Sequence, residues 1–200
     1  TSNITMFFTN YLPNTVGYSE NTIKSYRDTF VLLFLYAEEE HLTKRGKISI
    51  ELFRKDTIVA FLEWLEIKRG VSVSTRNQRL AALKSFSRYM SLNTVEYLDT
   101  FQAVLDIPPK KGSSKTVYYL TVEAITLLLK EPDASSYSGI RDLAILSLLY
   151  ESGCRVQELI DLKYGDLSLN SPATISVTGK ENKTRIIPIS NKVVSILNKY

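Results

Sequence analysis

Residues 148–167 read LLYESGCRVQELIDLKYGDL, and this stretch joins an apolar helix to a second helix through the pair Gly153-Cys154. Arg155 stands at the joint and begins the second helix, which is predicted over Arg155–Leu162. Backbone N–H groups at a helix start point outward and the local dipole favours anions, so a guanidinium beside them suits a phosphate. A simpler interpretation is that Arg155 pairs with Glu158 one turn along the helix.

Downstream of this stretch, the sequence predicts two short strands joined by a polar turn. Thr174–Thr178 alternates as a strand, Gly179–Lys183 forms the turn, and Thr184–Ile189 makes the return strand. Lys180 lies in that turn, where an ammonium group could move toward a phosphate, although an isolated turn lysine is usually no more than exposed charge. Ser190 is predicted to cap a last helix.

Upstream, Ile140–Tyr150 is a nearly continuous apolar helix that we expect at the centre of a second core. Thr121 is predicted to cap the helix before it. The segment 107–117 has paired prolines, a Gly-Ser pair and three lysines without apolar periodicity, which is typical of an interdomain linker. The chain therefore divides into a domain 1–106, this basic linker and a domain 118–200.

The first domain is predicted to be a small helical bundle. A short helix over Ile4–Leu12 is expected to stop at Pro13, and a longer helix begins behind a Ser19 cap and ends at Glu38-Glu39-Glu40. The other expected helices are Asp56–Arg69, Thr75–Ser91 behind a Ser74 cap, and Thr94–Leu105.

The helix over Thr75–Ser91 carries different residues on its different sides. Its apolar side presents Leu80, Leu83, Phe86 and Met90, and Arg79 falls close to that side. A second side gathers Asn77, Lys84 and Arg88, with Arg76 at its margin. A basic stripe with an asparagine is typical of a helix laid against a DNA groove. Taken alone, the stripe is better explained as a solvated helix face.

Composition limits the class of protein. Hydrophobic residues make up 44% of the 200 residues and charged residues 23%, as in a soluble globular protein, and no apolar run approaches the length of a membrane span. The single cysteine, Cys154, excludes an internal disulfide and fits the cytoplasm, and the single histidine, His41, excludes a His-rich metal site. The net charge of +4 permits nucleic acid as a partner.

In combination, these motifs resemble the tyrosine recombinase family, of the Xer and phage-integrase type. The first match is GCRVQEL at 153–159, followed by Leu162 and Asp166. The second match is TGKENKTR at 178–185, with Ile186-Ile187-Pro188 after it. The family's helical core-binding domain is resembled by Asn21-Thr22-Ile23-x-x-Tyr26 and by Asn77-x-x-Leu80-x-x-Leu83-x-x-Phe86, so the resemblance covers nearly the whole chain.

The resemblance implies a mostly α fold, in which an N-terminal SAM-like core-binding bundle precedes the first part of a mixed α/β catalytic domain with a small β-hairpin. It also implies DNA integration and recombination by cleavage and rejoining through a phosphotyrosine intermediate, without metal, nucleotide or other cofactor. In that chemistry Arg155 stabilises the charged transition state, Lys180 protonates the leaving oxygen, and Glu158 orients Arg155.

The family's His-x-x-Arg box and its nucleophilic tyrosine are expected after the hairpin. None of the twelve tyrosines stands in the nucleophile's context, and His41 belongs to the first domain. We therefore expect a C-terminally truncated recombinase that does not cleave DNA by itself. Apolar surface should be exposed where the absent helices would pack.

The expected partner is double-stranded DNA at a specific recombination site, bound by a homotetramer of the full-length cytoplasmic protein, with the fragment monomeric and no membrane involved. The side chains expected to contact DNA are Lys24, Arg27, Arg76, Asn77, Lys84, Arg88, Lys110, Lys111, Lys115, Lys183 and Arg185. Two alternatives stay open: a non-catalytic DNA-binding or regulatory protein on the same fold, and a helical interaction protein without a nucleic-acid partner.

Overall fold

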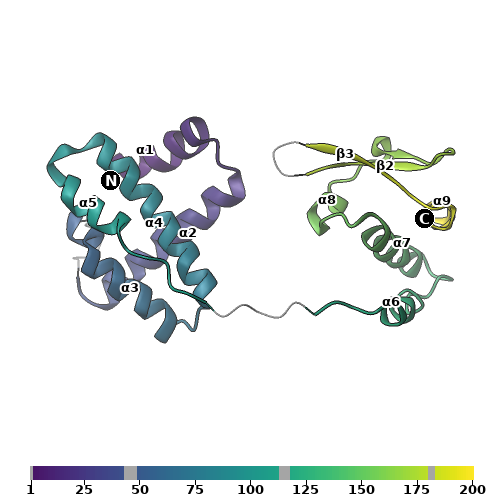
Figure 1. The fold of residues 1–200 in the computed structure, drawn as a ribbon, viewed down its shortest axis with the longest axis horizontal. Coiled ribbons are helices and arrows are strands. Elements are labelled where there is room, and N and C mark those ends of the chain that lie inside the picture. The colour runs from purple at the N-terminus through teal and green to yellow at the C-terminus, as the bar shows by residue number, and fades with distance from the viewer. Residues whose placement is uncertain (1, 43–48, 113–117, 180–182) are drawn as a thin grey trace. The chain divides into compact units, whose positions relative to one another are not determined.

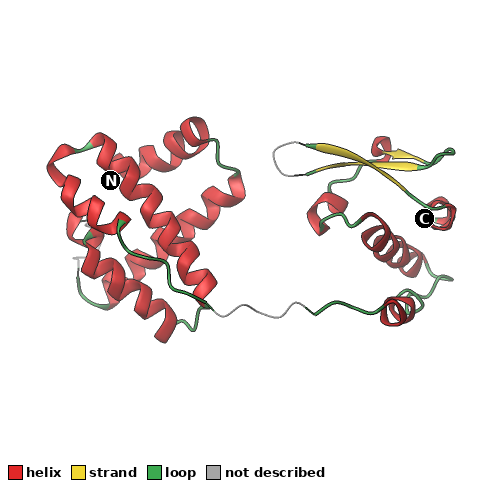
Figure 2. Ribbon diagram, viewed as in Figure 1, coloured by secondary structure: helices red, strands yellow, loops and turns green. Residues whose placement is uncertain are grey.

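A computed structural model describes residues 2–42, 49–112, 118–179 and 183–200 of the chain. The chain forms two compact units, Thr1–Lys115 and Thr116–Tyr200 (Figure 1). The described part of the first unit is helical, whereas the second combines helices with a small antiparallel sheet (Figure 2). The predicted fold class, mostly α with a small sheet in the second half, is confirmed.

The first unit is a bundle of helices. Its elements are α1 (Ser2–Met6), η1 (Phe7–Val16), α2 (Glu20–Glu39), η2 (Ile50–Phe53), α3 (Lys55–Ile67), α4 (Val73–Asn93), η3 (Val95–Tyr97) and α5 (Leu98–Leu105). The predicted Ser19 cap is confirmed, because its hydroxyl accepts a hydrogen bond from the backbone N–H of Thr22 at 3.4 Å.

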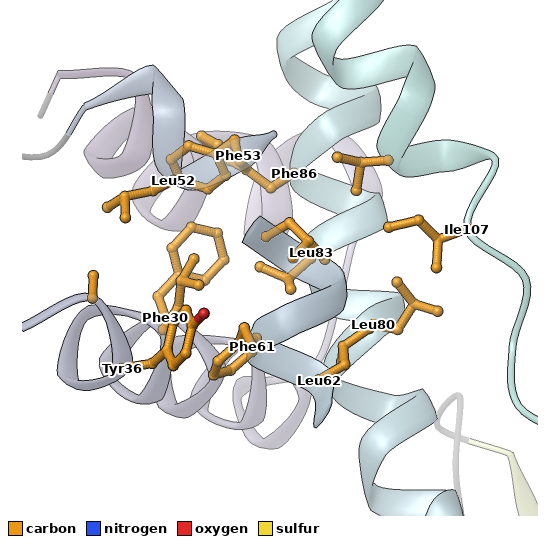
Figure 3. Packing of buried hydrophobic residues seen from close by; sticks show 14 of the residues in the cluster. Phe30, Tyr36, Leu52, Phe53, Phe61, Leu62, Leu80, Leu83, Phe86 and Ile107 are labelled. Carbon is orange, nitrogen blue, oxygen red and sulfur yellow. The ribbon is translucent and has the colours of Figure 1, made fainter. Parts of the chain in front are cut away.

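Aromatic rings from several elements meet in the core of the first unit. The ring of Phe86 on α4 lies 5.1 Å from Phe7, 5.2 Å from Phe30 and 4.9 Å from Phe53. Figure 3 shows Phe30, Phe53 and Phe86 among the aliphatic side chains of the same core. Because these partners come from η1, α2 and η2, one residue joins four elements, and each such ring pair adds about 0.5–1.5 kcal/mol beyond area burial.

Two predicted boundaries in the first unit are wrong. The first helix does not stop at Pro13, because the chain runs through it as a π-helix that ends at Gly17 with φ of +74°. The wider π-helical turn places Phe7 and Leu12, five residues apart, in the core together, and both side chains are fully buried.

The cap of α4 is Ser72 and not the predicted Ser74. The Ser72 hydroxyl accepts a hydrogen bond from the backbone N–H of Thr75 at 3.2 Å and also lies 3.1 Å from the Thr75 hydroxyl. The helix therefore begins at Val73, earlier than its apolar periodicity indicates, because a cap is set by local hydrogen bonding rather than by burial.

The second unit is built around three antiparallel strands in the order β1-β2-β3. Its elements are α6 (Val122–Leu128), α7 (Tyr137–Ser152), α8 (Val156–Ile160), η4 (Tyr164–Asp166), β1 (Leu167–Ser168), β2 (Thr174–Thr178), β3 (Thr184–Pro188) and α9 (Asn191–Lys199). The predicted hairpin corresponds to β2 and β3, which pair with Ile175 opposite Ile187 and Val177 opposite Arg185.

The core of the second unit lies between the sheet and its helices. Ile175 and Val177 of β2 are fully buried and belong to one cluster with Leu148 of α7 and Val193 of α9. In Figure 1, α7, α8 and α9 lie on one side of the β2–β3 hairpin. Burial of alternate residues of β2 follows from the two-residue period of a strand whose one face is covered.

Helix bounds in the second unit also differ from the prediction. The central helix α7 begins at Tyr137 behind a Ser136 cap, whose hydroxyl accepts the Gly139 N–H at 3.1 Å, rather than at Ile140. The helix predicted over Arg155–Leu162 is shorter, and Arg155 precedes it as its N-cap residue with extended backbone.

Apolar side chains are exposed at the start of the second unit. No residue of α6 is buried, and apolar side chains are exposed on it and just before it: Tyr118, Tyr119, Leu120, Val122 and Leu127. A hollow of about 700 Å³ in the same unit includes Ala144, Leu148 and Leu159 among its lining residues. Across the described ranges, no helix has both the length and the apolar character needed to cross a bilayer.

Candidate functional site

The turn between α7 and α8 places Arg155 at the surface. Helix α7 ends at Ser152 and is followed by Gly153, whose φ of +59° lies in the left-handed region and whose N–H donates to the Leu149 carbonyl at 3.1 Å. This residue is a glycine because other residues rarely adopt that conformation. The following residue, Cys154, is buried, whereas the side chain of Arg155 is 73% exposed.

The exposed Arg155 is held by a buried carboxylate. Nη1 of Arg155 donates to Oε1 of Glu158 at 2.7 Å, and the backbone N–H of Arg155 donates to Oε2 at 2.9 Å. The Glu158 side chain is only 6% exposed. The rest of the guanidinium makes no hydrogen bond to the residues that the structure describes, so its remaining N–H groups can bind an anion.

Glu158 is also bound from the hairpin. Nη2 of Arg185 on β3 donates to Oε2 of Glu158 at 2.7 Å, and its Nη1 lies 3.4 Å from Oε1. These hydrogen bonds from Arg185, followed by those from the backbone and side chain of Arg155, lower the pKa of Glu158 to about 2. The carboxylate is therefore ionised at any ordinary pH, and it links the start of α8 to the hairpin.

Close approach of this carboxylate explains the glycine at position 179. A methyl carbon on Gly179 would lie 2.8 Å from Oε1 of Glu158 and 3.4 Å from Nη1 of Arg185. The N–H of Gly179 donates to the Lys183 carbonyl at 2.9 Å and so closes the end of the β2–β3 ladder. The predicted site lysine, Lys180, lies outside the described residues.

Beside this cluster is an open hollow of about 620 Å³ whose lining includes Glu158, Asp161 and Asp166. Its carboxylates make it a poor place for a phosphate, so the exposed face of Arg155 is the better candidate. No group of three His, Cys, Asp or Glu side chains within the described ranges is arranged to hold a metal ion.

Three side chains of the predicted DNA-contact stripe on α4, those of Arg76, Asn77 and Lys84, form hydrogen bonds within the first unit. Arg76 is buried, with Nη1 donating to Oδ1 of Asn77 at 3.1 Å and Nε 3.9 Å from Glu66. Nζ of the half-buried Lys84 donates to the Leu105 carbonyl at 2.5 Å. Arg76 and Lys84 thus have partners on α3 and α5 within the first unit.

Asn77 holds the segment that follows α5. Its Nδ2 donates to the Lys110 carbonyl at 2.8 Å, and its Oδ1 accepts the Lys110 N–H at 2.9 Å. Nζ of Lys110 forms an ion pair with Glu66 at 2.8 Å, and Ile107 is buried. The described first part of the expected linker therefore lies against the first unit, and Asn77 anchors it there.

The remaining predicted contacts fall into three groups. Exposed in the structure are Lys24, Arg27, Arg88, Lys111 and Lys183. Arg79, which is not among the predicted contacts, donates to the Ser25 carbonyl at 2.8 Å and so joins α4 to α2, in agreement with its predicted place near the apolar side. Arg185 is paired with Glu158, and Lys115 lies outside the described residues.

Known families match both units. The sequence pattern of the Phage integrase family matches residues 118–200, and that of the Phage integrase N-terminal SAM-like domain matches residues 7–93. A protein of Sinorhizobium fredii named as an integrase/recombinase is 37% identical over 182 residues, which cover 91% of this chain and 55% of that protein.

A tyrosine recombinase XerD of Staphylococcus haemolyticus is 34% identical over 184 residues, covering 92% of this chain and 59% of that protein. The chain thus spans less than two thirds of the length of these relatives. The structure of the XerH site-specific recombinase bound to palindromic difH substrate matches with a TM-score of 0.67 over 88% of this chain and 51% of that chain, at 20% identity, which shows a shared fold. The N-terminal unit matches the SAM-like domain of phage integrases and the C-terminal unit matches the phage integrase family itself. The chain therefore belongs to the tyrosine recombinases of the phage integrase family.

Proposed function

We propose that this chain acts in site-specific DNA recombination, in which it holds duplex DNA and presents Arg155 to the phosphate that is cleaved. The observation that carries the proposal is the Arg155 guanidinium, which is 73% exposed and yet oriented by a nearly buried carboxylate. The names of the relatives, tyrosine recombinases and an integrase/recombinase, support the same function.

The proposed chemistry follows from the charge of the reacting phosphate. Attack by a hydroxyl gathers negative charge on the non-bridging oxygens, and an oriented guanidinium meets that charge with several N–H donors. Glu158 remains ionised during the reaction because its pKa is about 2, so it accepts hydrogen bonds from Arg155 throughout. Lys180 is proposed as the proton donor to the leaving oxygen, on its sequence position alone.

Duplex DNA is the proposed partner, bound at a specific recombination site by exposed basic side chains. The exposed ones are Lys24 and Arg27 on α2, Arg88 on α4, Lys111 and Lys183. Lys115 is added on its sequence position alone. Support comes from proteins of the same fold that were solved on DNA, such as the Tn1549 transposon integrase in complex with transposon right end DNA, at a TM-score of 0.66. Phosphate contacts of this kind weaken steeply as salt concentration rises.

The proposal extends to the whole recombinase, which would work in the cytoplasm as a homotetramer through a phosphotyrosine intermediate. The 200 residues contain no His-x-x-Arg sequence and no tyrosine in the nucleophile's context. By themselves they are proposed to be monomeric, to bind DNA weakly and not to cleave it.

A nicked suicide substrate, in which cleavage traps the covalent protein–DNA complex, tests the proposal on the recombinase that carries these residues. Arg155→Ala and Lys180→Ala should each abolish most of the trapped complex. Arg141→Ala is the matched control, because Arg141 is an exposed arginine of the same unit that pairs with Asp142 at 2.8 Å. Cleavage by both site variants at the wild-type rate would refute the proposed chemistry, and a wild type that binds DNA without cleaving it would support the non-catalytic alternative.

A further inference from the structure

Arg185 lies on β3, and its guanidinium is turned toward α8. Its Nη2 is 2.7 Å from Oε2 of Glu158 and its Nη1 is 3.4 Å from Oε1, so the guanidinium contacts both oxygens of the carboxylate. The Arg185 side chain is 42% exposed, less than the 73% of Arg155. Glu158 thus lies between two arginines, one that is ordered by its contacts and one that reaches into solvent.

The charges of the three groups explain why a second arginine is useful there. Arg155 and Glu158 alone would form a neutral pair, and a neutral pair attracts an anion weakly. Arg185 supplies a second positive charge to the same carboxylate and leaves the cluster with a net charge of +1. The electrostatic potential at the exposed Arg155 guanidinium then favours a phosphate, and Glu158 still fixes the orientation of that guanidinium.

The hairpin contributes a second constraint on the same carboxylate. A methyl carbon on Gly179 would meet Oε1 of Glu158 at 2.8 Å, so the carboxylate lies directly against the end of β2. Arg185 comes from the neighbouring strand, where it pairs in register with Val177. Because Arg185 on β3 bonds Glu158 and the chain at Gly179, just after β2, lies against it, the position of Glu158 depends on the hairpin as well as on α8.

We infer that Arg185 is a positioning residue for the proposed reaction: it holds the Glu158 carboxylate and offsets its charge, so that Arg155 presents an oriented cation to a DNA phosphate. The inference rests on the proposed function. It differs from the expectation that Arg185 contacts DNA, since its guanidinium is already paired with Glu158. The hydrogen bond from Arg185 is also the largest cause of the lowered pKa of Glu158.

The effect on Arg155 can be measured in the 200-residue chain with inorganic phosphate as the probe. The side-chain Nε–Hε resonance of Arg155, identified by its loss in Arg155→Lys, is followed by NMR during a phosphate titration at pH 7. Arg185→Gln removes the charge and keeps a polar side chain, and we expect phosphate to bind about fivefold to tenfold more weakly. Arg185→Lys restores the charge without the two-pronged contact, and its affinity should fall by about twofold to threefold.

The control is Arg141→Gln, which removes one positive charge from the same unit and should leave the affinity unchanged. Wild-type affinity for phosphate in both Arg185 variants would overturn the inference. It would do so even if the variants were less stable than the wild type, because Arg185 would then have only a structural role. Should Arg185→Gln fail to fold, Arg185→Lys alone decides between the two results. An Arg155 resonance that does not respond to phosphate in the wild type would refute the proposed function instead, so the two failures are distinguishable.

A direct contact between Arg185 and DNA gives a different result in a second measurement. If Arg185 bound a backbone phosphate, Arg185→Gln would reduce the slope of log affinity against log salt by about one for duplex DNA. A positioning residue leaves that slope unchanged while the Arg155 response weakens. A reduced slope with an unaltered Arg155 response would overturn the inference.

Discussion

Gly179→Ala tests the candidate site without removing any charge. The added methyl carbon would lie 2.8 Å from Oε1 of Glu158, whereas ordinary contacts begin near 3.4 Å, so the carboxylate must move by about 0.6 Å. A shift of about this size would stretch the 2.7 Å hydrogen bonds from Arg155 and Arg185 toward the limit of hydrogen bonding. The φ of Gly179 lies outside the left-handed region, so alanine adds a steric conflict and no backbone strain.

We expect this crowding to destabilise the second unit by about 1–3 kcal/mol, the usual range for overpacking. Denaturant unfolding of the 200-residue chain measures that loss. The phosphate titration of the Arg155 resonance should show binding weakened about fivefold, because the carboxylate that orients Arg155 is displaced.

Gly165→Ala is the matched control, since no atom lies within 4 Å of its added methyl carbon and its φ is not in the left-handed region either. Its stability should stay within about 0.5 kcal/mol of the wild type. Equal phosphate affinity and equal stability in the two alanine variants would refute the close approach of Glu158 to the hairpin.

Two further predictions concern the linker anchor and the acid behaviour of the site. Asn77→Ala removes both hydrogen bonds to Lys110, worth about 1 kcal/mol each, and should speed amide hydrogen exchange at Lys110 about tenfold or more. The control, Asn93→Ala, loses only a hydrogen bond to Tyr89 of the same helix and should leave that exchange rate unchanged. Equal exchange rates in the two variants would contradict the role of Asn77 as an anchor. The pKa of Glu158 is lowered from 4.5 to about 2 in the folded chain, so its pairing stabilises the second unit above pH 4.5 and is lost as the pH falls through 2. Glu158→Gln should therefore flatten the pH dependence of unfolding between these values, and an unchanged acid profile would show that Glu158 is not the group responsible.

Local sequence signals predict much of the fold because they act over short distances. Apolar spacing identifies α2 and α4, and alternation of apolar and polar residues identifies β2 and β3. The predicted caps are also found: the Thr121 hydroxyl accepts the Ala124 N–H at 3.2 Å, and the Ser190 hydroxyl accepts the Val193 N–H at 3.4 Å. The rule that proline ends a helix fails at Pro13, because a π-helix carries the chain past it.

The site could be predicted only where its contacts are local. Arg155 is the N-cap residue of α8 and Glu158 is the third residue of that helix, so their pairing follows from local capping geometry. The contact between Glu158 and Arg185 spans 27 residues and depends on the register of the hairpin and on the place of α8, neither of which periodicity determines. Likewise, Asn77 occupies a polar side of α4, but the sequence does not reveal that the chain near Lys110 covers it.

The central claim is that Arg155 meets the negative charge of the phosphate that is cleaved. The most direct measurement compares the single-turnover cleavage rate of the recombinase carrying these residues on two substrates, one with a normal scissile phosphate and one with a neutral methylphosphonate there. On the normal phosphate, Arg155→Ala should cleave about a hundredfold more slowly than the wild type or worse. On the methylphosphonate, where no negative charge needs a partner, the two proteins should differ by about tenfold at most. An equal deficit of Arg155→Ala on both substrates would contradict the claim.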